Sequence, residues 1–255
     1  MRKIIVAGNW KMNHNYDQAT GFVQELLPQL EVGQNNRVEM MIAPSFLFVE
    51  RLLTLTKNTK LMIGCQDISS EEKGAFTGEV SAGMLASIKG DFAIIGHSER
   101  REYHHESNEL IKKKLNKLLE YKIRPIVCIG ETLEQREEGI TKDVILSQLD
   151  GCFTGIDLNQ HHEVIIAYEP VWAIGTGKTA TPEMAEEVHS MIRAWLTSHY
   201  SRTTAEAIHI LYGGSMKPAN IKSLVSQPNI DGGLIGGAAL KVDSYLEMIK
   251  IVSKL

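Results

Sequence analysis

One stretch of this chain, AYEPVWAIGTGK at positions 167–178, combines residue types that could carry out a proton transfer. It leaves the apolar run Val164–Ala167, which places Glu169 at the mouth of an expected buried strand. Because a residue before proline is held in extended geometry, Pro170 constrains the direction of this carboxylate. Apolar residues and a glycine-rich turn containing Gly175 follow. This order predicts a general base at a strand end, covered by a flap.

Two other interpretations of the same stretch were considered. A strand-end glutamate before a glycine-rich turn also fits an ordinary surface loop, so the stretch alone does not establish a site. The letters GTGKT at 175–179 resemble the end of a nucleotide-binding P-loop, but that motif requires glycine five residues before Gly177. Trp172 occupies that position, so the P-loop interpretation fails.

Two further side chains that could act on a carbonyl compound follow apolar runs. Lys11 comes after Ile4–Ala7, where a local cation could attract an anion to a chain whose net charge is −4. His97 ends the segment FAIIGH, and a polar, helix-like segment begins at once. If the first N–H groups of that helix point at the ring, they disfavour a second proton and keep the imidazole neutral. Taken singly, Lys11 could also be an ordinary surface lysine, and His97 could be a histidine that hydrogen-bonds a backbone group at the strand end.

Glycine pairs follow the last two apolar runs. Gly213-Gly214 leads through Ser215 into a helix start at Lys217–Asn220, and Gly236-Gly237 leads into the last helix. Glycine lets backbone N–H groups come close to an anion, and a helix N-terminus favours negative charge. The alternative is two tight turns between strands and helices. Two such pairs in succession, with Gly175 in the neighbouring flap, favour a phosphate site.

Composition narrows the class of protein. The 255 residues are 43% hydrophobic and 23% charged, which is typical of a folded globular protein. With 27 basic against 31 acidic residues, the chain has no charge excess suited to nucleic acid or a membrane surface. The N-terminal apolar run is too short for a signal peptide, and no later run approaches membrane-spanning length, so a cytoplasmic protein is expected. The three widely spaced cysteines are expected to be buried thiols.

The remaining histidines show no metal-binding pattern. His104-His105 and His161-His162 lie in hydrophilic stretches without a metal-ligand spacing to nearby Asp, Glu or Cys. The chain also lacks a serine-nucleophile motif. The sequence therefore indicates neither a metal site nor a serine nucleophile.

The elements that must position these residues recur at roughly thirty-residue spacing, the length of a strand, a crossover helix and two loops. Eight short runs are nearly continuous in apolar residues rather than alternating, as in parallel strands buried on both faces. These runs are Ile4–Ala7, Met40–Ala43, Leu61–Cys65, Phe92–Ile95, Ile126–Ile129, Val164–Ala167, Ile208–Tyr212 and Leu234–Ile235.

Helix-like stretches separate the runs, among them Leu110–Tyr121, Glu183–His199 and Asp243–Leu255. In Leu110–Tyr121 the apolar residues are expected on one face and the lysines on the other. No linker or composition shift divides the chain, which predicts one α/β domain, a (β/α)₈ barrel, over residues 1–255. A doubly wound sheet would carry a glycine fingerprint after its first strand, where this chain reads GNWKMN.

A closed barrel would bring all these candidates to one rim, because its sites lie at the carboxyl ends of the strands. One base, one hydrogen-bond donor, one cation and a phosphate cradle together define a reaction class. That class is proton abstraction next to a carbonyl in a small phosphorylated substrate, through an enediolate. A flap would shield this intermediate, which can lose phosphate in contact with water.

The sequence resembles the triosephosphate isomerase family over essentially its whole length. The resemblance implies a TIM barrel that interconverts dihydroxyacetone phosphate and glyceraldehyde 3-phosphate without cofactor or metal. The stretches that carry it are Asn9-Trp10-Lys11, GCQDISSEEKGAFTGEVS (64–81), IIGHSERR (94–101), VCIGE (127–131), AYEPVWAIGTGK (167–178), YGGS (212–215) and DGGLIGGAAL (231–240).

The resemblance also implies roles for individual residues. Glu169 would be the catalytic base and His97 the electrophile or proton shuttle. Asn9 and Lys11 would contact the substrate, and Lys11 would take part in catalysis. One small departure is Ala239, where the family often has serine, and it affects none of these roles. The residues that would hold the phosphate are Gly175, Ser215, Gly236 and Gly237.

Two alternatives remain from the sequence. A different phosphate-binding barrel, an isomerase or a lyase, would act on a larger substrate that a closing flap would exclude. A non-catalytic barrel would be expected to lack Lys11, His97 or Glu169, and all three are present.

A long loop predicts how the chain assembles. Gln66–Val80 exceeds most strand-to-helix loops in length and carries Phe76 and Thr77 at its tip. An exposed phenylalanine in a protruding loop suggests burial against a partner, although it could also fold back on its own barrel. In the resembling family this loop docks beside the partner's Asn-Trp-Lys strand. The resemblance therefore implies a homodimer in which Thr77 orients Asn9 and Lys11 of the other subunit.

Overall fold

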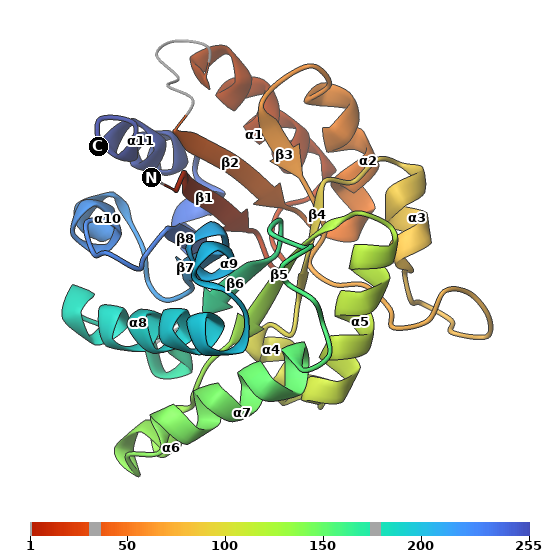
Figure 1. Cartoon of the computed structure of the whole chain (residues 1–255). Helices are drawn as coiled ribbons and strands as arrows, with labels where there is room; N and C mark the ends of the chain where they lie inside the picture. Colours follow the sequence, from red (N-terminus) through yellow and green to blue (C-terminus); the bar gives the residue numbers. More distant parts are fainter. Residues whose placement is uncertain (1, 31–36, 174–179) are drawn as a thin grey trace.

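Eight parallel strands alternate with helices along the chain in the computed structural model, which describes residues 2–30, 37–173 and 180–255 (Figure 1). Each predicted apolar run coincides with a strand, with ends that differ by a few residues. The strands are β1 Ile4–Asn9, β2 Val38–Ala43, β3 Leu61–Ile63, β4 Phe92–Ile95, β5 Arg124–Ile129, β6 Ile165–Tyr168, β7 His209–Tyr212 and β8 Gly232–Ile235.

The strands form a barrel whose order along the sheet is β3-β2-β1-β8-β7-β6-β5-β4. The two end strands of this order meet through a parallel bridge between Cys65 and Ala93. Two hydrogen bonds support the bridge, from the Cys65 N–H to the Phe92 carbonyl and from the Ile94 N–H to the Cys65 carbonyl. The arrangement is the predicted (β/α)₈ barrel, and it directs the carboxyl ends of all eight strands to one rim.

Helices cover the outside of the strands (Figure 1). The start of α8 fits its sequence: the Thr181 hydroxyl accepts from the Met184 N–H, and Pro182 is the first helical residue. The α-helices are α1 Tyr16–Leu30, α2 Phe46–Leu55, α3 Ala82–Ser87, α4 Ser98–Tyr103, α5 Asn108–Glu120, α6 Leu133–Glu137, α7 Thr141–Phe153, α8 Pro182–His199, α9 Arg202–Ala207, α10 Pro218–Val225 and α11 Val242–Val252, with 3₁₀ turns η1 Val171–Ala173 and η2 Gly237–Leu240.

The core has two layers because successive side chains of a strand point to opposite faces. In β1, Ile5 and Ala7 face the barrel interior, whereas Val6 packs outward with the helices. Both sets are buried, which accounts for the continuous apolar runs in the sequence. Cys65, Cys128 and Cys152 are buried free thiols, as predicted. No described helix has the length and apolar character that crossing a membrane requires.

One expected helix face is wrong. Lys114 in α5 was expected with the other lysines on the solvent face, but it is only 3% exposed. Its ammonium contacts both Asp67 oxygens at 2.6 and 2.8 Å and Glu106 Oε1 at 2.7 Å. Asp67 is 47 positions away in the sequence, and Glu106 lies in the loop before α5. The helical periodicity of α5 therefore gives no sign that these carboxylates compensate the buried charge of Lys114.

Candidate active site

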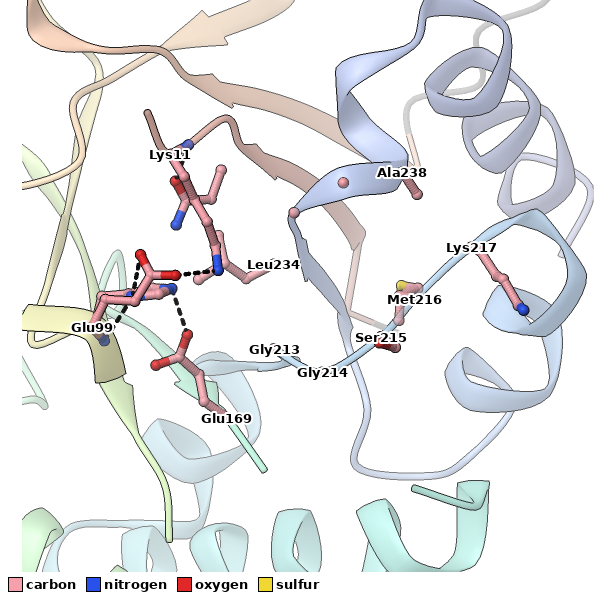
Figure 2. A pocket seen from close by; sticks show the side chains of 14 residues that line it. Lys11, Glu99, Glu169, Gly213, Gly214, Ser215, Met216, Lys217, Leu234 and Ala238 are labelled. Atoms are coloured by element: carbon pink, nitrogen blue, oxygen red, sulfur yellow. Dashed lines mark hydrogen bonds and ion pairs between the residues drawn. The ribbon is translucent and has the colours of Figure 1, made fainter. Parts of the chain in front are cut away.

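The site residues that were predicted at the barrel rim, and that the structure describes, line one cavity of about 530 Å³. Figure 2 shows Lys11 and Glu169 on one side of this cavity and Met216 and Lys217 on the other, with Gly213 beside Glu169. Of the predicted site residues, Gly175 lies outside the described part of the chain. The others all line the cavity: Asn9, Lys11, His97, Glu169, Ser215, Gly236 and Gly237.

Glu169 and His97 meet at the base of the cavity. Glu169 directly follows β6, and His97 follows β4 after one intervening residue. The two carboxylate oxygens have different partners: Oε1 is 2.9 Å from His97 Nε2, and Oε2 accepts from the Ser98 N–H at 2.9 Å. Glu169 is 2% exposed and His97 5%. A buried carboxylate thus has two nearby donors and one face toward the cavity.

The start of α4 determines which nitrogen of His97 carries the proton. The Glu99 N–H donates to His97 Nδ1 at 3.2 Å, so Nδ1 is an acceptor. Nε2 then carries the proton and faces the Glu169 carboxylate. The expected contact between the helix N–H groups and the ring is therefore present.

The ionisation of the pair differs from the expectation. Burial acts to lower the pKa of His97, but the adjacent Glu169 carboxylate outweighs it and raises that pKa above its ordinary value. Burial acts to raise the pKa of Glu169, but His97, the Ser98 N–H and Lys11 lower it. The helix N–H at Nδ1 favours the neutral ring, as expected, whereas the carboxylate at Nε2 favours the protonated ring.

Lys11 has a strained backbone and a paired side chain. Its φ is +51°, in the left-handed region that residues with a Cβ rarely adopt. Its N–H donates to Asn9 Oδ1 at 3.0 Å, and its carbonyl accepts from Gln66 at 2.8 Å and Ser45 at 3.3 Å. Its ammonium is 2.6 Å from Glu99 Oε1 (Figure 2). Strain held by several contacts is typical of functional sites.

The pairing of Glu99 with Lys11 was missed by the sequence analysis. Glu99 lies in the stretch IIGHSERR, and nothing in its spacing points to a residue that is 88 positions away. The Glu99 carboxylate pairs with the Lys11 ammonium at 2.6 Å.

The opposite wall of the cavity consists mainly of backbone. Gly236 and Gly237 precede and begin the 3₁₀ turn η2, and a Cβ at Gly237 would meet nothing within 4 Å. A Cβ at Gly213 would lie 2.7 Å from Glu169 Cγ, so this glycine permits the close approach of the β7 and β6 ends. The Ser215 hydroxyl donates to the Ala173 carbonyl at 3.1 Å, which joins the glycine wall to η1.

The start of the predicted flap is an anchor. Val171–Ala173 forms the turn η1, in which Trp172 and Ala173 are buried. Trp172 Nε1 donates to Glu131 Oε1 at 2.9 Å, and the Arg136 guanidinium lies 4.9 Å from the centre of the Trp172 ring. The rest of the predicted flap lies in residues 174–178, outside the described residues. Glu131 is the last residue of the stretch VCIGE, and its spacing in the sequence does not reveal that it holds Trp172.

Among the described residues, no three His, Cys, Asp or Glu side chains gather in a way that could hold a metal ion. The donors around the cavity suit a carbonyl oxygen and an anion: the His97 N–H, lysine ammonium groups and backbone N–H groups at glycines. The acceptor that faces them is a carboxylate able to take a proton.

Comparison with known proteins agrees with this chemistry. A family model described as triosephosphate isomerase matches residues 4–252. The protein named triosephosphate isomerase in Acetivibrio thermocellus is 45% identical over 249 residues, which cover 98% of both chains. The protein of the same name in Herminiimonas arsenicoxydans is 46% identical over 250 residues, 98% of this chain and 99% of that one.

Proposed function

This chain belongs to the triosephosphate isomerase family, and from that premise we propose which of its residues interconvert dihydroxyacetone phosphate and glyceraldehyde 3-phosphate. The observation that carries the proposal is the opposed pair at the base of the cavity, in which Glu169 Oε1 lies 2.9 Å from His97 Nε2. A base and a hydrogen-bond donor at this separation can act on adjacent atoms of one small substrate.

Glu169 is the base. In the direction from the ketose, its carboxylate takes a proton from the hydroxymethyl carbon, and the electron pair of that C–H bond forms a C=C bond to the carbonyl carbon. The carbonyl electrons move onto oxygen, which gives an enediolate. Return of a proton to the former carbonyl carbon, with proton transfer between the two oxygens, gives the aldehyde. No oxidant or cofactor is needed to balance this step.

His97 is the electrophile at the carbonyl oxygen. Its Nε2–H can donate to one acceptor at a time, so a substrate carbonyl that takes this hydrogen bond displaces the Glu169 oxygen. The displaced carboxylate is then free to face the substrate carbon. Removal of that contact also removes the main cause of the raised pKa of His97, which favours a neutral ring during catalysis.

Lys11 and the glycine wall hold the rest of the substrate. A phosphate dianion competes with Glu99 for the Lys11 ammonium, which is now 2.6 Å from that carboxylate. Ser215, Gly236 and Gly237 would supply backbone N–H groups to the same phosphate, and a Cβ at Gly236 would lie 3.7 Å from Lys11 Cε. Gly175 takes part from the flap in this proposal, which for that residue rests on the sequence alone.

We also propose that two copies of the chain assemble through the loop Gln66–Val80. Phe76 at its tip is 45% exposed, and the loop extends away from the barrel between β3 and α3 (Figure 1). Near its base lies a cavity of about 290 Å³ lined by Met12, Phe46 and other residues. Met12 is 95% exposed immediately beside Lys11, so a partner loop seated there would bring its Thr77 close to the active-site lysine.

The remaining assignments are that the whole chain is one catalytic domain and that it works in the cytoplasm. An aldose–ketose isomerase that needs no cofactor should act alone on its substrate.

The direct test supplies purified protein with glyceraldehyde 3-phosphate in the presence of a metal chelator, and follows the ketose with a dehydrogenase that consumes it and NADH. Ketose formation that chelation does not reduce is expected. Loss of activity on chelation, or no turnover, would contradict the proposal.

A further inference from the structure

Arg101 in α4 carries a guanidinium that contacts two backbone carbonyls, the Asn108 side chain and the Cys152 sulfur. Its Nε donates to the Gly96 carbonyl at 2.8 Å and one terminal nitrogen to the Cys128 carbonyl at 3.0 Å. The other terminal nitrogen donates to Asn108 Oδ1 at 2.7 Å. Within the described chain, no carboxylate oxygen lies within 4.0 Å of this guanidinium. Its positive charge is therefore not used in an ion pair.

One carbonyl belongs to Gly96, just after β4 and before His97, and the other to Cys128 near the end of β5, the strand between β4 and β6. The ladder between β4 and β5 ends at the pairing of Ile95 with Val127. Gly96 follows with φ +68°, a conformation that suits glycine, and it turns the chain toward His97. A Cβ at Gly96 would lie 3.2 Å from the Cys128 carbonyl oxygen, so the two strand ends approach closely here without a ladder hydrogen bond.

The β5 end supports the base directly. The Glu169 N–H donates to the Ile129 carbonyl at 2.7 Å, so that carbonyl points toward β6. Because successive carbonyls of a strand point to opposite sides, the Cys128 carbonyl points back toward β4. There the guanidinium of Arg101 supplies the donor that the ladder no longer provides. Arg101 thus bonds the residue before His97 and β5, the strand whose next residue, Ile129, accepts the Glu169 N–H.

We propose that Arg101 is a positioning residue that sets the separation between His97 and Glu169 by holding these two carbonyls together. The planar guanidinium presents several donors in a fixed arrangement, so one side chain can hold both carbonyls at once. A lysine ammonium at the same position keeps the charge but has a flexible stem and no rigid fork. The inference rests on the proposed function, because it concerns the geometry of the proposed base and electrophile.

The test is the Arg101→Lys variant, assayed at a temperature where circular dichroism shows it to be folded. A misplacement near 1 Å can cost about 10²-fold in rate, so we expect kcat to fall by about 10- to 100-fold while KM stays within about threefold. Loosening the contact of His97 with Glu169 should also lower the pKa of His97, measured from its ring ¹⁵N shifts. A residue that only stabilises the fold would lower the melting temperature without these two effects.

Matched control variants distinguish the positioning role of Arg101 from a general loss of stability. Arg202→Lys makes the same chemical change at an exposed ion pair with Glu206 and should leave kcat and the His97 titration unchanged. Asn108→Ala removes a partner of the same guanidinium without touching either carbonyl, and kcat should stay within about threefold of wild type. Wild-type kcat in folded Arg101→Lys would overturn the proposal.

Two further variants complete the test. If Arg101→Lys does not fold, Arg101→Gln is assayed in the same way. Failure of both variants to fold would assign the guanidinium to stability alone and overturn the proposal. Glu169→Asp distinguishes this inference from the function on which it rests. If kcat falls in Glu169→Asp but not in Arg101→Lys, only the positioning role of Arg101 is refuted. If kcat is unchanged in Glu169→Asp, the role of Glu169 as the base is refuted. If both hold, Arg101→Lys should cost less in the Glu169→Asp background than alone.

Discussion

The contact between His97 and Glu169 makes the ionisation of each side chain depend on the other. The carboxylate raises the pKa of His97 against the opposing effect of burial. In Glu169→Gln the charge is absent, so the pKa of His97 is expected to fall below its wild-type value. Titration of the ring ¹⁵N signals measures this change. An unchanged or higher pKa in Glu169→Gln would show that Glu169 is not the cause of the shift.

The same pair gives a pH dependence of stability whose sign follows from the two shifts. The pKa of Glu169 is lowered on folding, so its contribution is present above 4.5, its unfolded value, and is lost as pH falls through the folded pKa. The pKa of His97 is raised, so its contribution is present below 6.5 and is lost as pH rises through the folded pKa. The unfolding free energy of wild type minus that of Glu169→Gln should therefore be larger near about pH 5.5 than near about pH 9. Urea denaturation measures both values.

At this scale the sequence predicts the residues that touch the substrate and misses those that hold them. Lys11, His97 and Glu169 are recognisable because each closely follows an apolar run. Glu99 and Arg101 belong to a polar segment in which every residue looks like part of a solvated helix. Their roles depend on partners brought near by the barrel, such as Lys11 and the Cys128 carbonyl, and spacing along the chain cannot reveal them.

The turn η1 shows how an element after a strand is fixed in place. Trp172 Nε1, the Tyr168 hydroxyl and the Arg136 guanidinium all donate to Oε1 of the buried Glu131. Trp172→Phe removes one of these donors while keeping an aromatic ring. Because a hydrogen bond to a charged group contributes about 1.5–3 kcal/mol, the unfolding free energy should fall by about that amount.

Tyr168→Phe is the matched control, since it removes a different donor to the same oxygen and should cost a similar amount. Urea denaturation at one protein concentration compares the two variants with wild type. Unchanged stability in Trp172→Phe would mean that this hydrogen bond does not hold the turn.

The bounds of a strand were predicted well where an apolar run spans it and less well where the strand begins with glycine. The run Leu234–Ile235 marks only the end of β8, which begins at Gly232 and pairs there with Ile5. Glycine contributes no apolar side chain to the pattern, so the first half of the strand gives no signal. Likewise, the apolar residues Val171 to Ala173 indicated a flap, but they form a turn whose tryptophan is buried.

Assembly is the prediction that belongs to the whole molecule. Phe76→Glu with Thr77→Asp places two charges at the loop tip, where a partner surface would have to bury them without compensation. We expect a folded monomer, because Phe76 and Thr77 are exposed and contribute little to the barrel itself. Turnover should fall strongly, since Thr77 of the partner subunit would no longer orient Asn9 and Lys11.

Sedimentation and activity at matched concentrations decide this prediction. Glu71→Lys, a charge change at an exposed position of the same loop away from its tip, is the control and should remain dimeric. A wild-type chain that sediments as a fully active monomer would contradict the assembly proposal. The barrel itself was predicted from its recurring runs, whereas the partner surface is suggested only by exposed side chains such as Met12 and Phe76.

The central claim is that Glu169 takes the proton from the substrate carbon, and the most direct measurement is the kinetics of Glu169→Asp. The substitution keeps the carboxylate but withdraws it by one methylene, about 1 Å, a misplacement that can cost about 10²-fold. The account predicts a fall of that order in kcat with KM nearly unchanged, because the groups that bind the phosphate are untouched. Wild-type kcat in Glu169→Asp would contradict it.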